Sequence, residues 1–364
     1  MKKHAIIPIF VPHFGCSYTC VFCNQKSITG HQHKLDPAAI SYVIEEHLAT
    51  MPDELVPELA FFGGSFTAIP EEEQIAYLQV VQPYIKNGSI SQIRISTRPD
   101  VIYKENLRLL YDHGVCVIEL GVQSLDPEVL RASGRPYNPE IVGISSSLIK
   151  DMGFILGHQV MVGLPKSSLA KEIATARKIA EIGPDILRIY PTVVIRETPL
   201  ALMFQRGEYQ PLTLEQAVEA CALLLTIYAK AGINIIRIGL QPSEELLAGS
   251  ELIAGPFHPS FGELVESEVF RRQAALAIAG FTKGGTAEDL RLYVNRRDLS
   301  KMIGHGRCNI RSLKNMFGLA NIKTTGLDGL VLNAVGVGYI NSDSPQLVLS
   351  RQDYCDLCEH QVMI

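Results

Sequence analysis

Three cysteines, Cys16, Cys20 and Cys23, lie within eight residues near the N-terminus. The spacing Cys-x3-Cys-x2-Cys places three thiolates on one loop, where they can hold three irons of a [4Fe–4S] cube and leave the fourth iron without a protein ligand. An iron with an open position can bind and reductively cleave a small chelating cofactor. Zinc is the alternative, because His13 could supply the fourth ligand that a structural zinc site requires.

Strands that alternate with helices are expected to position this loop. The apolar runs predict strands at 5–12, 58–62, 90–96, 115–120, 154–161 and 186–190. Helical patterns lie between and after them, at 37–49, 71–85, 104–113, 139–152, 169–182 and 213–229. Such alternation predicts an α/β fold in which helices cover a parallel sheet, with six βα units forming a full or partial barrel.

Short polar or glycine-rich segments follow the predicted strands. They include Gly63-Gly64-Ser65, Gly121-Val122-Gln123 and Gly163-Leu164-Pro165, and the cysteine loop follows the first strand. In parallel α/β folds, function belongs to the loops at the C-terminal ends of the strands. We therefore expect these loops to converge on one site.

The cysteine motif, with the aromatic Phe22 directly before its third cysteine, resembles that of the radical S-adenosylmethionine (SAM) superfamily. The resemblance implies a partial TIM-like barrel, with Cys16, Cys20 and Cys23 as ligands of a [4Fe–4S] cluster. It also implies SAM as second cofactor, cleaved to a 5′-deoxyadenosyl radical, and an electron donor such as a flavodoxin or ferredoxin. The glycine loops, in order with the cysteines, favour this interpretation over zinc.

Further cofactor-binding residues follow from the same resemblance, and Phe22 is one of them. The glycine motif with Ser65 is similar to one whose backbone receives the methionine amino group, and Gly163 belongs to a motif beside the adenine. Gln123 and Arg135 resemble contacts to the ribose and carboxylate in coproporphyrinogen-oxidase relatives, although Arg135 could equally be a surface cation. Glu119 lies in an apolar strand, so it is either a site residue or paired with a core arginine such as Arg98 or Arg188. We favour the site.

Segments 96–100, 119–124 and 189–196 closely resemble the radical domain of Elongator catalytic subunits, which modify the wobble uridine of tRNA. The likeness covers residues 5–240 and implies RNA, in particular tRNA, as substrate. Arg188 and Tyr190 could face that substrate, although the tyrosine could equally be a core residue. We expect no acetyltransferase domain after residue 240, so the acetyl-dependent reaction of those subunits does not transfer to this chain.

The length of 364 residues predicts one large domain and a smaller one, since single cores stop growing near roughly 250–300 residues. The resemblance implies that the large domain is a radical SAM core at 1–240, and we expect a smaller α+β domain at 241–364. Residues 281–324 carry nine Lys and Arg against three Asp and Glu, in a protein of net charge −5. A solvated face is one explanation. The other is RNA binding, because the segment 302–310 resembles the glycine-rich loop of KH domains, with Arg307 in place of the second glycine. Arg296, Arg297 and Arg307 are then candidate RNA contacts.

Composition excludes several classes of protein. A hydrophobic content of 47% excludes disorder, and the net charge of −5 argues against wholesale wrapping by nucleic acid. No apolar run reaches the ~18 residues of a membrane span, and the N-terminus is a poor signal peptide, so we expect a cytoplasmic protein. Cys355 and Cys358, with His360, could form half a zinc site. The sequence does not indicate an oligomeric state.

Two alternatives to an RNA-modifying radical enzyme stay open on the sequence. One is the same radical chemistry on a small molecule, such as a porphyrin-like substrate or a metabolite. The other is a protein that binds a metal cluster and RNA without catalysis.

Overall fold

The computed structural model describes residues 5–11, 19–23, 35–52, 54–241, 246, 249–283 and 289–358. Cys16, His13 and His360 lie outside these residues. The chain forms two compact units, the first comprising Met1–Pro211 with Ser243–Gly255 and the second Leu212–Pro242 with Pro256–Ile364.

The first unit supplies six parallel strands of one sheet. They are β1 (Ile6–Val11), β2 (Glu58–Gly63), β3 (Ile93–Thr97), β4 (Val115–Gln123), β5 (Ile155–Val162) and β6 (Ile186–Pro191). Each pairs with the next strand along the chain. The order and direction confirm the predicted α/β fold with a partial barrel of parallel strands, and they bring the C-terminal ends of all six strands to one edge.

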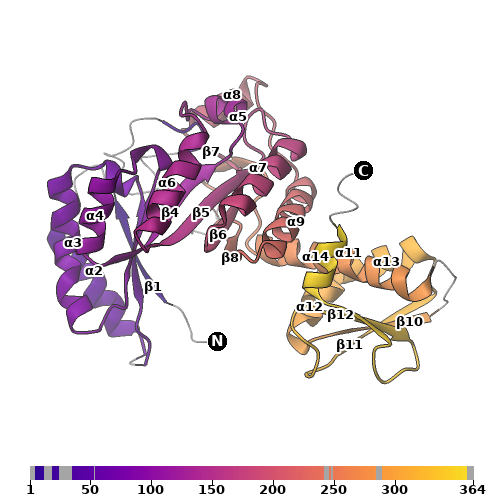
Figure 1. Ribbon diagram of the computed structural model, residues 1–364. Coiled ribbons are helices and arrows are strands. Elements are labelled where there is room, and N and C mark those ends of the chain that lie inside the picture. Colours follow the sequence, from indigo (N-terminus) through magenta and orange to yellow (C-terminus); the bar gives the residue numbers. More distant parts are fainter. Residues whose placement is uncertain are drawn as a thin grey trace. The chain divides into compact units, whose positions relative to one another are not determined.

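Helices connect these strands, and one more helix follows the last of them. They are α2 (Pro37–Thr50), α3 (Glu71–Lys86), α4 (Lys104–Asp112), α5 (Pro127–Ala132), α6 (Glu140–Asp151), α7 (Leu169–Ile182) and α8 (Pro199–Gln205). In Figure 1, α2, α3 and α4 lie together on one side of the sheet. Several of these helices have a capping side chain at the N-terminus. Asp126 accepts hydrogen bonds from two backbone N–H groups of α5, and Ser168 accepts one from a backbone N–H in the first turn of α7.

The two faces of the sheet have different surroundings. On β4, Ile118, Leu120 and Val122 are fully buried on the face that the helices cover. His158 of β5 pairs with Leu120 in the strand register and contacts Ser146 of α6. Leu120 and His158 therefore face the helices together, and the residues next to them in each strand face the other way. Glu119, one residue from Leu120, therefore faces the barrel interior.

Two short strands complete the first unit. β7 (Val194–Ile195) pairs antiparallel with β9 (Leu252–Ala254), although almost sixty residues separate them in the sequence. They bring the segment after β6 and the segment 249–255 together.

The second unit holds three long helices and a four-stranded sheet. It contains α9 (Leu214–Lys230), β8 (Asn234–Ile238), α11 (Phe261–Thr282), β10 (Asp289–Val294), α12 (Leu299–Ile303), α13 (Cys308–Phe317), β11 (Asn321–Gly326), β12 (Val335–Tyr339), β13 (Leu347–Leu349) and α14 (Arg351–Cys358). The strands lie in the order β11-β10-β12-β13, with β10 and β11 parallel and the other pairs antiparallel. Helix α11 packs on this sheet (Figure 1), which confirms the predicted α+β domain. Within the described part of the chain, no helix is both long and apolar enough to span a bilayer.

Candidate functional site

Charged side chains cross the interior face of the sheet from strand to strand. Arg94 on β3 donates to both carboxylate oxygens of Glu58 on β2, at 2.8 and 2.9 Å, and also to Glu119 on β4. Arg188 on β6 donates to the two oxygens of Glu119 at 2.7 and 3.0 Å. Gln159 on β5 adds an amide donor to Glu119 at 2.9 Å. Two carboxylates and two guanidinium groups thus neutralise one another.

Glu119 is 1% exposed at the centre of this network. Burial alone would raise the pKa of Glu119, but the charges of Arg188 and Arg94 outweigh burial and lower this pKa below its ordinary value. Gly157, its register partner on β5, makes room for the carboxylate, because a Cβ there would lie 2.8 Å from Glu119 Cγ. Of the two sequence interpretations, the pairing with Arg188 is present, and Arg98 pairs with Asp100 instead. A contact between Glu119 and the cofactor stays a prediction.

The cysteine loop is described from residue 19 to residue 23. The Cys23 N–H donates to the Cys20 carbonyl at 3.1 Å, which closes a turn between the two cysteines. Val21 fixes that turn on both sides, since its N–H donates to Ser133 at the end of α5 and its carbonyl accepts from Leu200 of α8. The loop is therefore held between two helices of the first unit.

Gly134 permits this close approach. Its φ is +72°, and a Cβ at this position would lie 2.6 Å from the Thr19 carbonyl oxygen. A side chain would displace the cysteine loop. Glycine is therefore required both for its positive φ and for the space that the loop occupies. Sequence reasoning missed this residue, because the contact joins segments more than a hundred residues apart.

Phe22 packs against an apolar cluster rather than standing alone on the loop. The cluster consists of Val194, Leu200, Ala201 and Tyr209. Val21 packs against the same side chains. The aromatic residue before the third cysteine thus anchors the loop, whereas its predicted contact with the cofactor stays a prediction.

Arg135 joins the cysteine loop to the end of β4. The side chain is buried, and its Nη1 donates to Cys20 Sγ at 3.2 Å. Its Nη2 donates to the Gly121 carbonyl, and its Nε donates to the Tyr137 hydroxyl at 3.1 Å. A guanidinium is always protonated and can only donate, so Arg135 places a positive charge directly against the Cys20 sulfur. Arg135 is therefore not a surface cation.

Gln123 supplies a buried acceptor without a partner. The residue ends β4 with φ +64°, and among the described residues no hydrogen-bond partner reaches its Oε1. Gly121 leaves space beside it, because a Cβ there would lie 3.0 Å from Gln123 Nε2. The buried Ser96 Oγ on the same face also has no partner among these residues. Unsatisfied buried polar groups are costly, so this cradle fits a polar ligand such as a ribose.

Two side chains hold the backbone of Gly163 at the end of β5. Glu172 of α7 accepts the Gly163 N–H at 2.7 Å and the Ser167 hydroxyl at 3.0 Å. The Tyr209 hydroxyl donates to the Gly163 carbonyl at 2.6 Å. Burial raises the pKa values of both Glu172 and Tyr209. Sequence reasoning missed both residues, which no motif singles out.

Of the remaining predicted residues of the first unit, Gly63, Gly64 and Ser65 lie at the end of β2, and Arg188 and Tyr190 lie on β6. Gly63 has φ +97°, and the Gly64 N–H donates to Val11 at the end of β1, with Ser65 buried beside it. Arg188 lies over the Phe62 ring, 5.6 Å from its centroid. The structure therefore brings the β2 and β6 ends to the same interior.

The predicted RNA contacts belong to the second unit. Arg296 pairs with Asp328 at 3.1 Å, whereas Arg297 and Arg307 are exposed. Cys355 is buried in α14, and burial raises its pKa to about 11. Among the described residues, no three His, Cys, Asp or Glu side chains gather as metal ligands.

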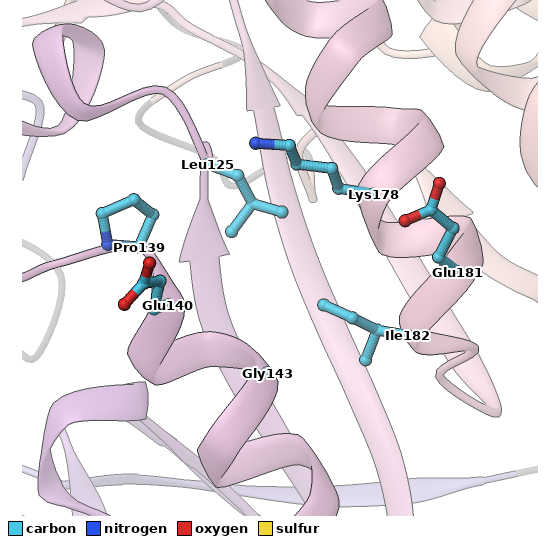
Figure 2. Close-up of a pocket in the computed structure, with 7 residues that line it drawn as sticks. All are labelled: Leu125, Pro139, Glu140, Gly143, Lys178, Glu181 and Ile182. Carbon is cyan, nitrogen blue, oxygen red and sulfur yellow. The ribbon is translucent and has the colours of Figure 1, made fainter.

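A separate groove of about 390 Å³ lies between α6 and α7. Figure 2 shows Lys178, Glu181 and Ile182 of α7 opposite Pro139 and Glu140. The groove is lined by residues of α6 and α7 together with Leu125 and Pro139, and it shares none with the barrel interior, so it is not part of the candidate site.

Residues 10–179 match the family described as the Radical SAM superfamily, and residues 184–271 match the Radical SAM C-terminal domain. A tRNA uridine(34) acetyltransferase of Methanocaldococcus infernus is 32% identical over 163 residues, which are 44% of this chain and 30% of that protein. Elongator complex protein 3 of Homo sapiens is 29% identical over 190 residues, which are 47% of this chain and 35% of that protein. The chain thus spans about a third of the length of these relatives.

A solved structure has the same fold. The archaeal Methanocaldococcus infernus Elp3 with an N-terminal deletion superposes with a TM-score of 0.60 at 23% identity, covering 74% of this chain and 63% of that one. Together with the family matches, this similarity confirms the resemblance drawn from the cysteine motif.

Proposed function

Since the chain belongs to the radical SAM superfamily, with a [4Fe–4S] cluster and SAM as cofactors, we propose that it generates a 5′-deoxyadenosyl radical to modify tRNA. The observation that carries the site assignment is the buried Arg135, which connects the Cys20 sulfur to the Gly121 carbonyl. Cys20, a candidate cluster ligand, thus lies beside the end of β4, where the Gln123 Oε1 has no hydrogen-bond partner among the described residues.

Cys16, Cys20 and Cys23 would hold the cluster, which when bound supplies the electron that cleaves the carbon–sulfur bond of SAM. The protein's part is to position the reactants and exclude water. Arg135 holds a positive charge at the Cys20 sulfur. Val21 and Phe22 pack against the apolar cluster, which covers the loop on that side against water. A flavodoxin or ferredoxin would deliver the electron.

The strand ends would bind SAM. The backbone at Gly63, Gly64 and Ser65 would receive the methionine amino group, and Gln123 would accept a hydrogen bond from a ribose hydroxyl. Gly163 would lie against the adenine, with its peptide groups held by Glu172 and Tyr209. Glu119 supports this site from the interior network of ion pairs.

Transfer RNA is proposed as the substrate because the relatives are named for tRNA uridine(34) acetylation and for Elongator. Arg188 and Tyr190 on β6 would face the substrate from the barrel interior. The acetyl-dependent part of the reaction is not proposed, since the matched segments cover only about a third of those proteins.

The test is anaerobic reconstitution with iron, sulfide and dithionite, followed by measurement of 5′-deoxyadenosine and methionine formed from SAM. Cys20→Ser should abolish both products, whereas the matched control Cys116→Ser, at an exposed cysteine, should leave them unchanged. Absence of both products from fully loaded wild-type protein would remove the enzymatic function.

The substrate is tested separately by mass spectrometry of tRNA nucleosides from cells with and without the protein. A nucleoside that disappears with the gene supports tRNA. Identical nucleosides, together with active SAM cleavage, would point to a small-molecule substrate instead.

A further inference from the structure

Positive charge is concentrated in one continuous segment of the second unit. Residues 299–327 contain five Lys and Arg and no Asp or Glu, in a protein whose net charge is −5. They are Lys301, Arg307, Arg311, Lys314 and Lys323. Segregation of this kind creates a local positive field that the net charge conceals.

The segment folds as strand, helix, loop, helix, strand. β10 leads into α12, a tight loop at 304–307 connects α12 to α13, and β11 returns parallel to β10. His305, Gly306 and Arg307 are all exposed. The loop is thus exposed to solvent between α12 and α13, the two helices that connect β10 to β11.

The base of this loop is fixed in the core. Asn309 is 3% exposed, and its amide donates to the Ser267 carbonyl of α11 at 2.8 Å and to the Met302 carbonyl of α12 at 3.2 Å. A Cβ on Gly304 would lie 2.6 Å from Cys308 Sγ, so the chain passes closely here. An exposed loop on a rigid base presents its charges without a large ordering cost on binding.

Exposed arginines lie in the segment before α12, in the loop and in α13. Arg307 has φ +62° and is exposed, and Arg311 lies one turn into α13, where it donates to the Gly306 carbonyl. Arg297, also exposed, follows the end of β10. Arg296 differs, because Asp328 neutralises it.

We propose that this loop surface, defined by Arg297, His305, Arg307 and Arg311, binds the sugar–phosphate backbone of single-stranded RNA. Guanidinium groups contact phosphates, and a tight glycine-containing turn between helices lets the backbone of a nucleic acid approach closely. Contacts from these side chains to phosphate carry no direct sequence information, so we expect binding that depends only weakly on RNA sequence. The inference rests on the proposed function in that the RNA would be the tRNA substrate, and it adds a binding site within the second unit.

The test measures fluorescence anisotropy of a labelled, unmodified tRNA transcript with the full chain. Arg307→Gly removes the guanidinium, and glycine suits the positive φ, so the fold is retained. We expect binding about three- to tenfold weaker, and a plot of log K against log salt that is shallower by about 0.7. Adding Arg297→Gln should weaken binding again.

Arg108→Gln is the matched control, because it removes one exposed arginine from α4 in the first unit. It should leave the affinity and the salt slope unchanged. The inference is overturned if Arg307→Gly behaves like this control, if wild-type protein does not bind the transcript, or if polyglutamate competes as well as unlabelled RNA.

SAM cleavage in the absence of RNA separates the two hypotheses. Loss of RNA binding in Arg307→Gly supports the loop surface whether or not 5′-deoxyadenosine forms. Active SAM cleavage with RNA affinity unaffected by Arg307→Gly would overturn the loop surface alone.

Discussion

The guanidinium of Arg135 donates a hydrogen bond to the Cys20 sulfur, with Nη1 and Sγ 3.2 Å apart, although 115 residues separate the two in the sequence. Arg135 also donates to the Gly121 carbonyl, so one buried cation contacts both the cysteine loop and the end of β4. Hydrogen bonds to the sulfur ligands are among the factors that set the potential of an iron–sulfur cluster. The pair therefore connects a proposed ligand of the cluster to the end of β4, where we propose that SAM binds.

Replacing Arg135 by Gln should make the cluster harder to reduce. The substitution removes a positive charge beside a ligating sulfur, so the reduced and more negative cluster loses stabilisation. We expect a more negative reduction potential, measured by a titration followed with EPR, at unchanged iron content. Arg131→Gln, which removes an exposed cation from α5, should leave the potential unchanged. Equal potentials in both variants would contradict a role for Arg135.

Gly134→Ala should lower the amount of cluster that the protein retains. The new Cβ would lie 2.6 Å from the Thr19 carbonyl and push the cysteine loop away from α5. Gly114→Ala is a close match, because Gly114 has a similar φ of +78° but no atom within 4 Å of the added Cβ. Both variants carry a backbone strain of about 1–2 kcal/mol, and only the first meets the loop. Iron per chain after reconstitution should fall in Gly134→Ala alone, and equal loss in both would assign the effect to strain.

Tyr209→Phe should weaken SAM binding without removing the cluster. The substitution keeps the ring in its apolar cluster and deletes the hydroxyl that donates to the Gly163 carbonyl at 2.6 Å. One lost hydrogen bond is worth about 0.5–1.5 kcal/mol, which corresponds to a Kd for SAM that is about two- to tenfold higher. Equilibrium dialysis of labelled SAM against reconstituted protein measures it. Tyr84→Phe, which removes a hydroxyl bonded to Glu45 on the exposed helices, should bind SAM like wild type.

The positions of the strands in the sequence were predictable because each depends on a local apolar pattern. The six predicted strands of the first unit agree with β1 to β6 to within a few residues, since buried parallel strands are near-continuous apolar runs. The pairing of β7 with β9 was not predictable. Two- and three-residue strands carry little pattern, and their partners lie far apart in the sequence.

The candidate site was predictable only where a motif marks it. The cysteine spacing and the glycine turns are local signals, so Cys20, Gly63 and Gly163 could be chosen from the sequence. Glu119 could not be decided, because its environment depends on arginines that β3 and β6 contribute. Glu172 and Tyr209 act on Gly163 through tertiary hydrogen bonds, which leave no periodicity or spacing to detect.

His158 should make the folded protein less stable as the pH falls below about 6.5. The ring is 1% exposed between β5 and α6, and burial, with a smaller contribution from Lys150, lowers its pKa to about 3. Between pH 6.5 and 3 the unfolded chain binds a proton that the folded chain does not, so stability is complete above the unfolded pKa and decreases as the pH falls. The slope approaches about 1.4 kcal/mol per pH unit within this window. His158→Gln keeps a polar partner for Ser146 and removes the titration. Urea midpoints measured from pH 7 to 4.5 should therefore decline more steeply in wild type than in His158→Gln, whereas parallel declines would show that His158 titrates alike in both states.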